Sequence, residues 1–323
     1  LAYKLQHYGF SSIIIGPSKK ISEKNDKNLF IEWKELKKNT TLLQEVKLLK
    51  NLAEKYKAKI VILDTHKYNE KFIHNLKVLK YHLIQFSQSF KFKKYVDLII
   101  CASPAIVLSK KIKINSLNNN KKKFLLGPKY ALIREEFVKI KKSKKYIKKI
   151  PKIISIIIGG GNDRGAIVYI LKTLALKFNN IRFNVLTTNN NNSNSKINKF
   201  IKNYKLKNIN LEIDTKKFAS RFYESDICII SGGYTTFEAA YLNIPFLTIE
   251  ISKEQKTNAN SWQKLISCSN MGPLRKLSEK KVLNQFSKIY NSYNKRKLII
   301  NKQKNIIDSK GSDRICKEII KIK

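Results

Sequence analysis

The sequence lacks any apolar run long enough to cross a membrane, and it lacks the features of a secretory signal. A membrane-spanning helix needs about 20 consecutive apolar residues, and no stretch of the 323 residues approaches that length. The chain opens on LAYKLQHYGF, with neither a methionine nor a basic segment before an apolar one. We therefore expect a cytoplasmic protein without a membrane span. Because this opening has the pattern of an amphipathic helix, we also expect an upstream segment before Leu1.

Paired cysteine motifs are missing as well. The four cysteines (Cys101, Cys228, Cys268 and Cys316) show no Cys-x-x-Cys spacing, which metal sites and redox centres commonly use. Cys101 and Cys228 end or lie within apolar runs, so the pattern predicts buried free thiols in a reducing compartment. We expect no metal site and no cofactor.

Arginine is scarce, although the formal net charge is +43. Only seven of the 66 basic residues are arginine, the residue that nucleic-acid sites favour for its bidentate fork and its stacking. No zinc-finger, RNP or KH motif is present. The lysine excess accompanies many isoleucines and asparagines, as compositional drift in an AT-rich genome would produce. We expect a solvated lysine surface that attracts polyanions without specificity, and no specific nucleic-acid partner.

Short apolar runs alternate with helical patterns in both halves of the chain. The predicted strands cover residues 12–15, 59–63, 81–86, 96–101, 153–158, 181–187, 209–213, 226–230 and 246–249. The predicted helices lie near 42–52, 69–79, 163–178, 195–204, 215–223 and 235–242. Strands that are apolar without alternation are typical of a parallel sheet covered on both faces.

The length fits two domains of about 150 residues each. The lysine-rich segment 138–150 reads as a connector that ends at Pro151. We predict an N-terminal α/β domain over residues 1–145 and a second α/β domain, with C-terminal helices, over residues 150–323. In such sheets, ligands bind at the carboxyl ends of the strands.

One strand-to-helix junction, SGGYTTFE at residues 231–238, has the composition of a phosphate-binding loop. Its glycines allow a close approach of the backbone to a ligand, and its hydroxyls and first-turn N–H groups can donate to phosphate oxygens. The residues concerned are Ser231, Gly232, Gly233, Thr235 and Thr236. Glu238 lies one helical turn further on, where a carboxylate can accept hydrogen bonds from ribose hydroxyls. A strand-to-helix turn of purely structural kind is the alternative reading.

A second glycine cluster, Gly159-Gly160-Gly161, also follows a predicted strand. It matches neither the Walker A loop nor the G-x-G-x-x-G fingerprint, so it does not indicate a P-loop NTPase or a dinucleotide-binding protein. Two such loops in one domain suit a nucleoside diphosphate that lies across the strand ends.

Four motifs together carry a family resemblance: GPKYALIREEF at 127–137, IIGGGND at 157–163, SGGYTTFE at 231–238 and KEQ at 253–255. The second half resembles the nucleotide-sugar domain of GT-B enzymes, and the whole chain resembles the UDP-sugar hydrolases of pseudaminic acid biosynthesis and their spore-coat relatives. The resemblance implies an α/β fold with two Rossmann-like domains facing a cleft. It also implies a monomeric, metal-free enzyme in which water replaces UDP at the anomeric carbon of a UDP-linked 2,4-diacetamido-2,4,6-trideoxyhexose.

The resemblance also implies roles for individual residues. The UDP site would comprise the two glycine loops, Glu238 on the ribose and the backbone near Ile213 on the uracil. The sugar side would comprise Tyr130, Arg134, Glu254 and Gln255. Glu254 stands where the family has an amide.

The family's catalytic histidine would lie upstream of Leu1. Within the sequence the catalytic candidates are Asp64 and His66, and either His66 or Tyr68 stands in the place of a family tyrosine. A GT-B UDP-sugar glycosyltransferase and a non-catalytic, polyanion-binding relative remain as alternative functions.

Overall fold

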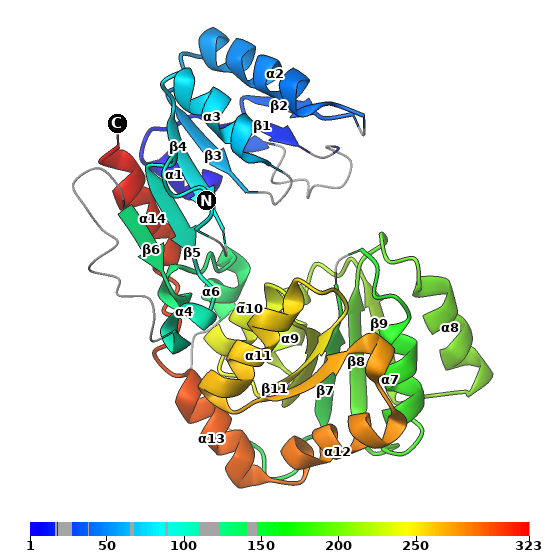
Figure 1. Ribbon diagram of the computed structural model, residues 1–323. Coiled ribbons are helices and arrows are strands. Elements are labelled where there is room, and N and C mark those ends of the chain that lie inside the picture. The colour runs from blue at the N-terminus through cyan, green and yellow to red at the C-terminus, as the bar shows by residue number, and fades with distance from the viewer. Residues whose placement is uncertain are drawn as a thin grey trace. The chain divides into compact units, whose positions relative to one another are not determined.

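The computed structural model describes residues 1–16, 18, 28–37, 39–64, 68–87, 90–109, 123–140, 147–159 and 161–322. It divides into two compact units (Figure 1). Unit 1 comprises Leu1–Ile106, Lys110–Leu132 and Lys310–Lys323, and unit 2 comprises Val107–Ser109 and Ile133–Ser309. Each unit is described below by itself.

Unit 2 is built on a six-stranded sheet in which every pairing is parallel. Its strands are β7 (Ile153–Ile157), β8 (Arg182–Thr187), β9 (Ile209–Ile213), β10 (Ile227–Ser231), β11 (Phe246–Glu250) and β12 (Ser269–Pro273). Their spatial order is β12-β11-β10-β7-β8-β9. This is the doubly wound order, which reverses direction between its first and fourth strands, here β7 and β10.

Helices cover this sheet because its central strands are apolar on both faces. β10 and β11 are buried along their whole length, so both faces must be shielded from water. The helices are α6 (Glu135–Ile140), α7 (Ala166–Leu174), α8 (Asn194–Asn203), α9 (Phe218–Tyr223), α10 (Thr235–Tyr241), α11 (Gln255–Ile266), α12 (Glu279–Tyr290) and α13 (Tyr293–Gln303). Helix α7 contacts α8 and α12, whereas α13 contacts α10, α11 and α12.

Unit 1 contains two separate parallel sheets. One has four strands in the order β3 (Ile60–Leu63), β4 (His82–Phe86), β5 (Leu98–Cys101) and β6 (Lys123–Leu126). The other is the pair β1 (Ile13–Gly16) and β2 (Glu32–Glu35). The helices of this unit include α1 (Ala2–His7), α2 (Leu42–Lys55), α3 (Glu70–Val78) and α14 (Gly311–Ile320), with a 3₁₀ turn, η3, at Pro128–Tyr130.

Local signals in the sequence fix the starts of helices α2 and α3. Helix α2 begins with a capping box in which the Thr41 side chain accepts from the Gln44 backbone and the Gln44 side chain accepts from the Thr41 backbone. Helix α3 begins at an Asn69 cap that accepts from the backbone of Phe72.

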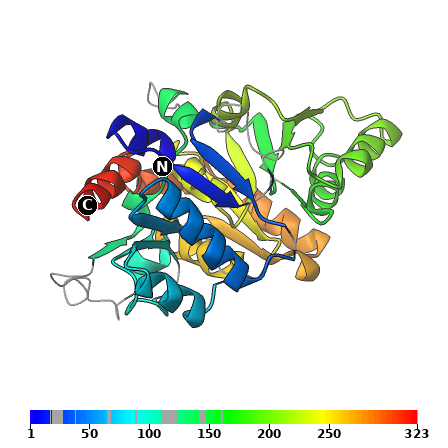
Figure 2. The same cartoon turned by 90° about the horizontal axis from the view of Figure 1, so that it is seen from above.

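Helix α14 departs from the predicted boundary, which assigned all of residues 150–323 to the second domain. It packs on unit 1, where Ile315, Cys316 and Ile319 share a buried cluster with Leu5 and Leu98. It lies beside α1 in both views (Figure 1, Figure 2). A pattern of local residues could not reveal this packing, because the contacts join segments that lie far apart in the sequence, such as Leu5 and Ile315.

The end of the N-terminal domain also differs from the predicted boundary at residue 145. Helix α6, which the prediction placed in the N-terminal domain and its connector, belongs to unit 2. The reason is aromatic packing: the Phe137 ring lies edge-on to Phe218 and Phe222, with ring centroids 6.0 and 5.6 Å apart.

All four cysteines are buried and free of disulfide bonds, as predicted. Burial raises the pKa of the Cys101, Cys268 and Cys316 thiols, so they stay protonated and unreactive. Among the described residues, no helix combines the length and the apolar character that a membrane crossing requires.

Candidate functional site

The two glycine clusters predicted from the sequence follow neighbouring strands. β7 and β10 pair directly, with Ile157 opposite Ile230. The loops that follow them, which contain Gly159, Gly161 and Ser231–Gly233, therefore leave the same edge of the sheet side by side. Gly160 lies outside the described residues. This edge is the point where the strand order reverses, the usual ligand crevice of an open α/β sheet.

Close packing against helix α11 requires glycine at position 232. A Cβ atom there would lie 3.0 Å from the carbonyl oxygen of Gln255 and 3.1 Å from the Cβ of Ala259. In the other loop, Gly159 has a φ of +65°, a left-handed conformation that favours glycine. The glycines of both clusters are therefore also explained by local structure, through close packing at Gly232 and a positive φ at Gly159, and not only by a ligand.

A buried asparagine that the sequence analysis missed organises the β10 loop. The Asn258 amide nitrogen donates to the carbonyl oxygens of Gly232 (2.8 Å) and Gly233 (3.3 Å) and to the Thr236 hydroxyl (3.1 Å). The Thr236 hydroxyl in turn donates to the Gly233 carbonyl oxygen at 2.7 Å. To donate to a phosphate oxygen, the Thr236 hydroxyl would therefore have to give up its hydrogen bond to the Gly233 carbonyl oxygen.

The β7 loop is braced by its own carboxylate. Asp163 is fully buried, and its Oδ2 accepts from the Ile167 backbone N–H of helix α7 at 2.8 Å. A carboxylate at this end of a helix already balances the positive end of the helix dipole. The start of α7 is therefore a less favourable position for a further anion than its free backbone N–H groups alone would make it.

Two residues that were predicted separately form one bidentate ion pair within unit 2. Arg134 donates from Nε to Glu238 Oε1 (2.7 Å) and from Nη2 to Glu238 Oε2 (3.1 Å). The Glu238 side chain is only 4% exposed, against 45% for Arg134. Arg134 also stacks on the rings of Phe137 and Phe218, at 4.8 and 4.9 Å from their centroids.

This geometry fixes the orientation of the Glu238 carboxylate. A planar guanidinium that holds both oxygens leaves each of them a further lone pair for another donor. A ribose hydroxyl could use these lone pairs without displacing Arg134. Arg134, predicted on the sugar side, thus lies against the predicted ribose residue.

Gln255 also lies at the β10 loop. Its Oε1 accepts from the Ile251 backbone N–H at 3.0 Å, and its Nε2 lies against Gly233. Glu254 is the residue that precedes the first turn of α11. Ile213 ends β9, one strand beyond β8. The predicted UDP residues and the predicted Glu254–Gln255 pair therefore all follow the carboxyl ends of strands in unit 2.

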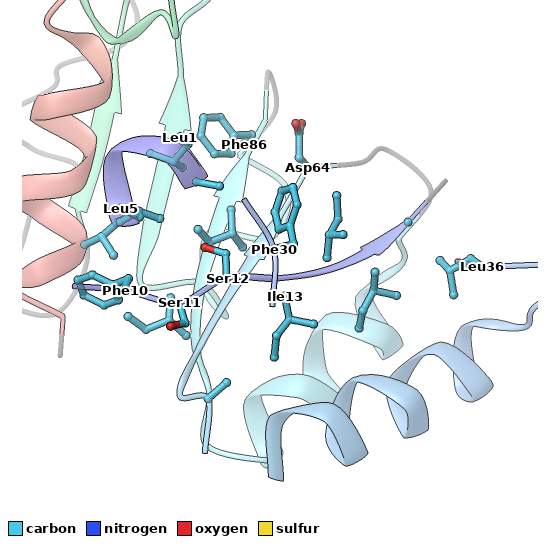
Figure 3. Close-up of a pocket in the computed structure, with 18 of the residues that line it drawn as sticks. Leu1, Leu5, Phe10, Ser11, Ser12, Ile13, Phe30, Leu36, Asp64 and Phe86 are labelled. Atoms are coloured by element: carbon cyan, nitrogen blue, oxygen red, sulfur yellow. The ribbon is translucent and has the colours of Figure 1, made fainter. Parts of the chain in front are cut away.

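The other predicted residues belong to unit 1. The Tyr130 ring packs at the edge of the cluster around Leu98 and Ile315. Asp64 follows the end of β3 and lines a cavity of about 940 Å³ (Figure 3). His66 lies outside the described residues.

The same cavity contains one polar pair that the sequence analysis did not predict. The Tyr68 hydroxyl donates to Glu45, a buried carboxylate on α2. Burial and, secondly, this hydrogen bond raise the pKa of Tyr68. Most of the remaining wall is apolar.

A helical repeat in the sequence could have revealed Asn258. It lies three residues after Gln255, so both fall on one face of α11, and that face meets the β10 loop. Asn258 was not among the predicted residues because the KEQ motif ends at Gln255.

Comparisons with known proteins identify the fold. No family model matches the chain. An uncharacterized protein of Methanocaldococcus jannaschii is 28% identical over 232 residues, which are 71% of this chain and 47% of the relative. The chain thus aligns with about half the length of that curated relative.

Among solved structures, MurG of Acinetobacter baumannii is similar over 99% of this chain and 93% of its own, with a TM-score of 0.69 and 11% identity. The spinosyn rhamnosyltransferase SpnG, complexed with thymidine diphosphate, is similar over 94% of this chain and 90% of its own, with a TM-score of 0.65 and 10% identity. The UDP-GlcNAc 2-epimerase of Neisseria meningitidis, bound to UDP-GlcNAc, is similar over 89% of this chain and 85% of its own, with a TM-score of 0.57 and 14% identity. These similarities confirm the predicted class: an α/β protein with two parallel-sheet units of the GT-B type.

Proposed function

We propose that this protein is an enzyme that binds a UDP-sugar on unit 2 and cleaves it. The observation that supports this most is the convergence of the two glycine loops and Glu238 at the edge of β7 and β10. The diphosphate would contact the β10 loop and the Gly159–Gly161 loop. Glu238, oriented by Arg134, would accept from the ribose hydroxyls, and the backbone near Ile213 would face the uracil.

Two of the similar structures contain ligands of this class. SpnG is complexed with thymidine diphosphate, and the Neisseria epimerase is bound to UDP-GlcNAc. Those ligands belong to those proteins. For this chain, the nucleotide is a proposal that rests on its own loops and on Glu238.

The reaction we propose is hydrolysis of a UDP-linked 2,4-diacetamido-2,4,6-trideoxyhexose. A water oxygen attacks the anomeric carbon, the bond from that carbon to the β-phosphate oxygen breaks, and UDP leaves with the bonding electrons. Donors in the β10 loop would stabilise the charge that develops on the diphosphate. A base takes the proton from water, a role typically worth about 10²–10⁴-fold in rate. Asp64, His66 or a residue upstream of Leu1 is the candidate base.

One structural observation favours the hydrolase family over other GT-B enzymes. The motif most specific to that family is YALIREEF, and its arginine, Arg134, holds the proposed ribose carboxylate. Arg134 thus links the family-specific motif to the nucleotide site. The second candidate is a glycosyltransferase that uses an acceptor hydroxyl in place of water, which the similarity to several transferase structures favours.

A nucleotide-binding experiment on the whole chain tests the proposed site. Calorimetry should show UDP binding, with a lower affinity for 2′-deoxy-UDP. Glu238→Gln should weaken UDP binding by about 1–3 kcal/mol, the cost of losing hydrogen bonds to a charged group, and should reduce the preference for the 2′-hydroxyl. Glu279→Gln is the matched control, because Glu279 is an exposed partner of Lys177 in the same unit. Equal UDP affinity in the wild-type protein and both variants would refute the ribose role.

An activity experiment separates the two candidate reactions. UDP release from the proposed substrate, measured on the natural full-length protein, should occur without an added acceptor. Release only with an acceptor would establish the transferase instead. Release in neither condition, together with no UDP binding, would reject both.

A further inference from the structure

Unit 1 has a gap between its two sheets. Within the described residues, β1 pairs only with β2, and β3 pairs only with β4. The facing edges of β1 and β3 therefore have no neighbouring strand, although both strands run parallel to their own partners. The cavity of about 940 Å³ lies at these two edges.

The walls of this cavity are apolar where a strand would run. All four residues of β1 (Ile13–Gly16) and two of β3 (Ile60 and Ile62) line it. Ile62 is 36% exposed. Exposed, apolar strand edges of this kind pair readily with another strand and are rarely left open in folded proteins.

The β1–β2 pair is also too small to be stable as an independent sheet. A two-stranded sheet is marginal in water, and parallel strands normally occur in larger sheets covered on both sides. Side-chain contacts tie the pair to α2: Glu32 on β2 accepts from Lys55 (2.8 Å) and from Tyr56 (2.7 Å). No backbone hydrogen bond of a sheet joins the described residues of β1 to those of β3.

We propose that one further parallel strand fills this gap, and that polypeptide joined to the amino end of α1 supplies it. Unit 1 then has a single seven-stranded sheet in the order β2, β1, the new strand, β3, β4, β5 and β6. The first four strands of that sheet would have the same doubly wound arrangement that unit 2 shows around β7.

The position of α1 identifies the source of the strand. Leu1 and Ala2, at the start of α1, line the cavity, and Figure 3 shows Leu1 near Phe86 and Asp64, with Phe10 and Ser11 at the opposite side. Phe86 ends β4 and Asp64 follows β3, so α1 begins at the carboxyl edge of the sheet. A parallel strand between β1 and β3 would end at that same edge, directly before α1.

The length of the connection agrees with this assignment. Twelve residues, 1–12, precede β1, and α1 lies among them. A crossover between parallel neighbours needs about 10–12 residues or more and usually contains a helix. A strand, α1 and β1 would thus form a right-handed strand–helix–strand unit of the ordinary kind.

The cavity also specifies the residues of the strand. β1 and β3 are each four residues long, so the strand should have four or five residues, at about 3.3 Å per residue. Leu1, Leu5 and Phe10 line one part of the cavity and Phe30 and Leu36 another, and most of its remaining wall is apolar too. The strand should therefore be apolar on both faces, and the loop that follows it should lie beside Asp64.

The experiment compares the 323-residue chain with the natural reading frame extended upstream by about 20 residues. Hydrogen exchange should slow about tenfold or more for amides in residues 13–16 and 60–63 when the extension is present. Amides of β7 and β8 serve as the internal reference and should not change. The matched controls are a Gly-Ser extension of equal length and the natural extension with proline at two central strand positions, because proline cannot donate to a ladder. Neither control should slow exchange.

Three results would overturn the proposal. The first is an upstream reading frame without an apolar run of four or five residues within about ten residues of Leu1. The second is unchanged exchange in β1 and β3 on adding the natural extension, while the β7 and β8 reference shows that the protein is folded. The third is protection in the 323-residue chain that rises with protein concentration together with a dimeric mass, because a second copy would then fill the gap. The test measures unit 1 alone, so its outcome is independent of nucleotide binding to unit 2.

Discussion

The sheets of the two units differ at equivalent places. In unit 2, β7 and β10 are neighbours, and the loops that follow them meet at the reversal of strand order. In unit 1, β1 and β3 lie at the edges of separate sheets, and a cavity lies at the corresponding place. Strand adjacency thus creates the candidate site in unit 2, because it brings two glycine loops to one edge.

The two places also differ in how their polar groups are held. In unit 2, Asn258 and Arg134 orient the β10 loop and Glu238 through hydrogen bonds of 2.7–3.3 Å. In unit 1, Asp64 lies in a mostly apolar cavity wall, where the Tyr68 hydroxyl donates to Glu45. A preorganised site needs supporting contacts, and those in unit 2 support the proposal that a nucleotide binds there.

The largest effect is expected where α14 completes unit 1. A Cβ atom at Gly311 would lie 2.2 Å from the Ala131 carbonyl oxygen, too close for the backbone of η3 to stay in place. Gly311→Ala should therefore lower the free energy of unfolding of unit 1 by about 3 kcal/mol, as overpacking does, despite alanine's better helix propensity. Urea unfolding monitored by circular dichroism measures the loss. Ser312→Ala, on the same helical turn, is the control; equal stability of the two variants would contradict the prediction.

A smaller effect is expected in unit 2, where two glycines of the candidate site can be compared. A Cβ atom at Gly232 would lie 3.0–3.1 Å from residues of α11, whereas one at Gly161 would meet nothing within 4 Å. Gly232→Ala should cost about 1–2 kcal/mol of unfolding free energy. Gly161→Ala should stay within about 0.5 kcal/mol of the wild type. Thermal unfolding measures both, and a larger loss at Gly161 than at Gly232 would disprove the packing argument.

The smallest effect concerns the pH dependence of unit 1. The pKa of Tyr68 is raised from its ordinary value of 10.0 by burial and by the hydrogen bond to Glu45. The folded protein therefore favours the protonated phenol, and this contribution to stability is present below pH 10 and is lost as the pH rises above it. Between pH 9 and 11, the wild type should lose more stability than Tyr68→Phe, as urea midpoints would show. Parallel pH profiles for the two proteins would exclude a role for this phenol.

Much of the fold follows from local sequence patterns. The strands β7, β8, β10 and β11 were predicted because short runs rich in apolar residues are typical of buried parallel strands. β9, which reads INLEI, was also predicted, although it is only partly buried. The prediction missed β2, β6 and β12. β6 reads KFLL and is largely buried, but its apolar run is only three residues long. β2 reads EWKE and is partly exposed. β12 reads SNMGP, and its glycine and proline are tolerated at the edge of the sheet.

The residue types of the candidate site could be predicted from the sequence, but the hydrogen bonds and ion pairs between them could not. Glycines and hydroxyls that follow a strand indicate a ligand loop, and the structure places both loops at one edge. Composition could not show that the Thr236 hydroxyl donates within its own loop, or that Arg134 holds Glu238 across 104 positions of sequence. Such pairings arise from tertiary packing, which no local pattern encodes.

The return of α14 to unit 1 has a consequence for synthesis on the ribosome. Gly311–Ile320 follows unit 2 in the sequence but completes the hydrophobic cluster around Leu5 and Leu98. A nascent chain therefore exposes that cluster until all of Ile133–Ser309 has been translated, and at about 5–20 residues per second this takes roughly ten seconds or more. Unit 2 can finish folding first although unit 1 is translated first. The unfinished face of unit 1 is then the surface that a chaperone would have to cover.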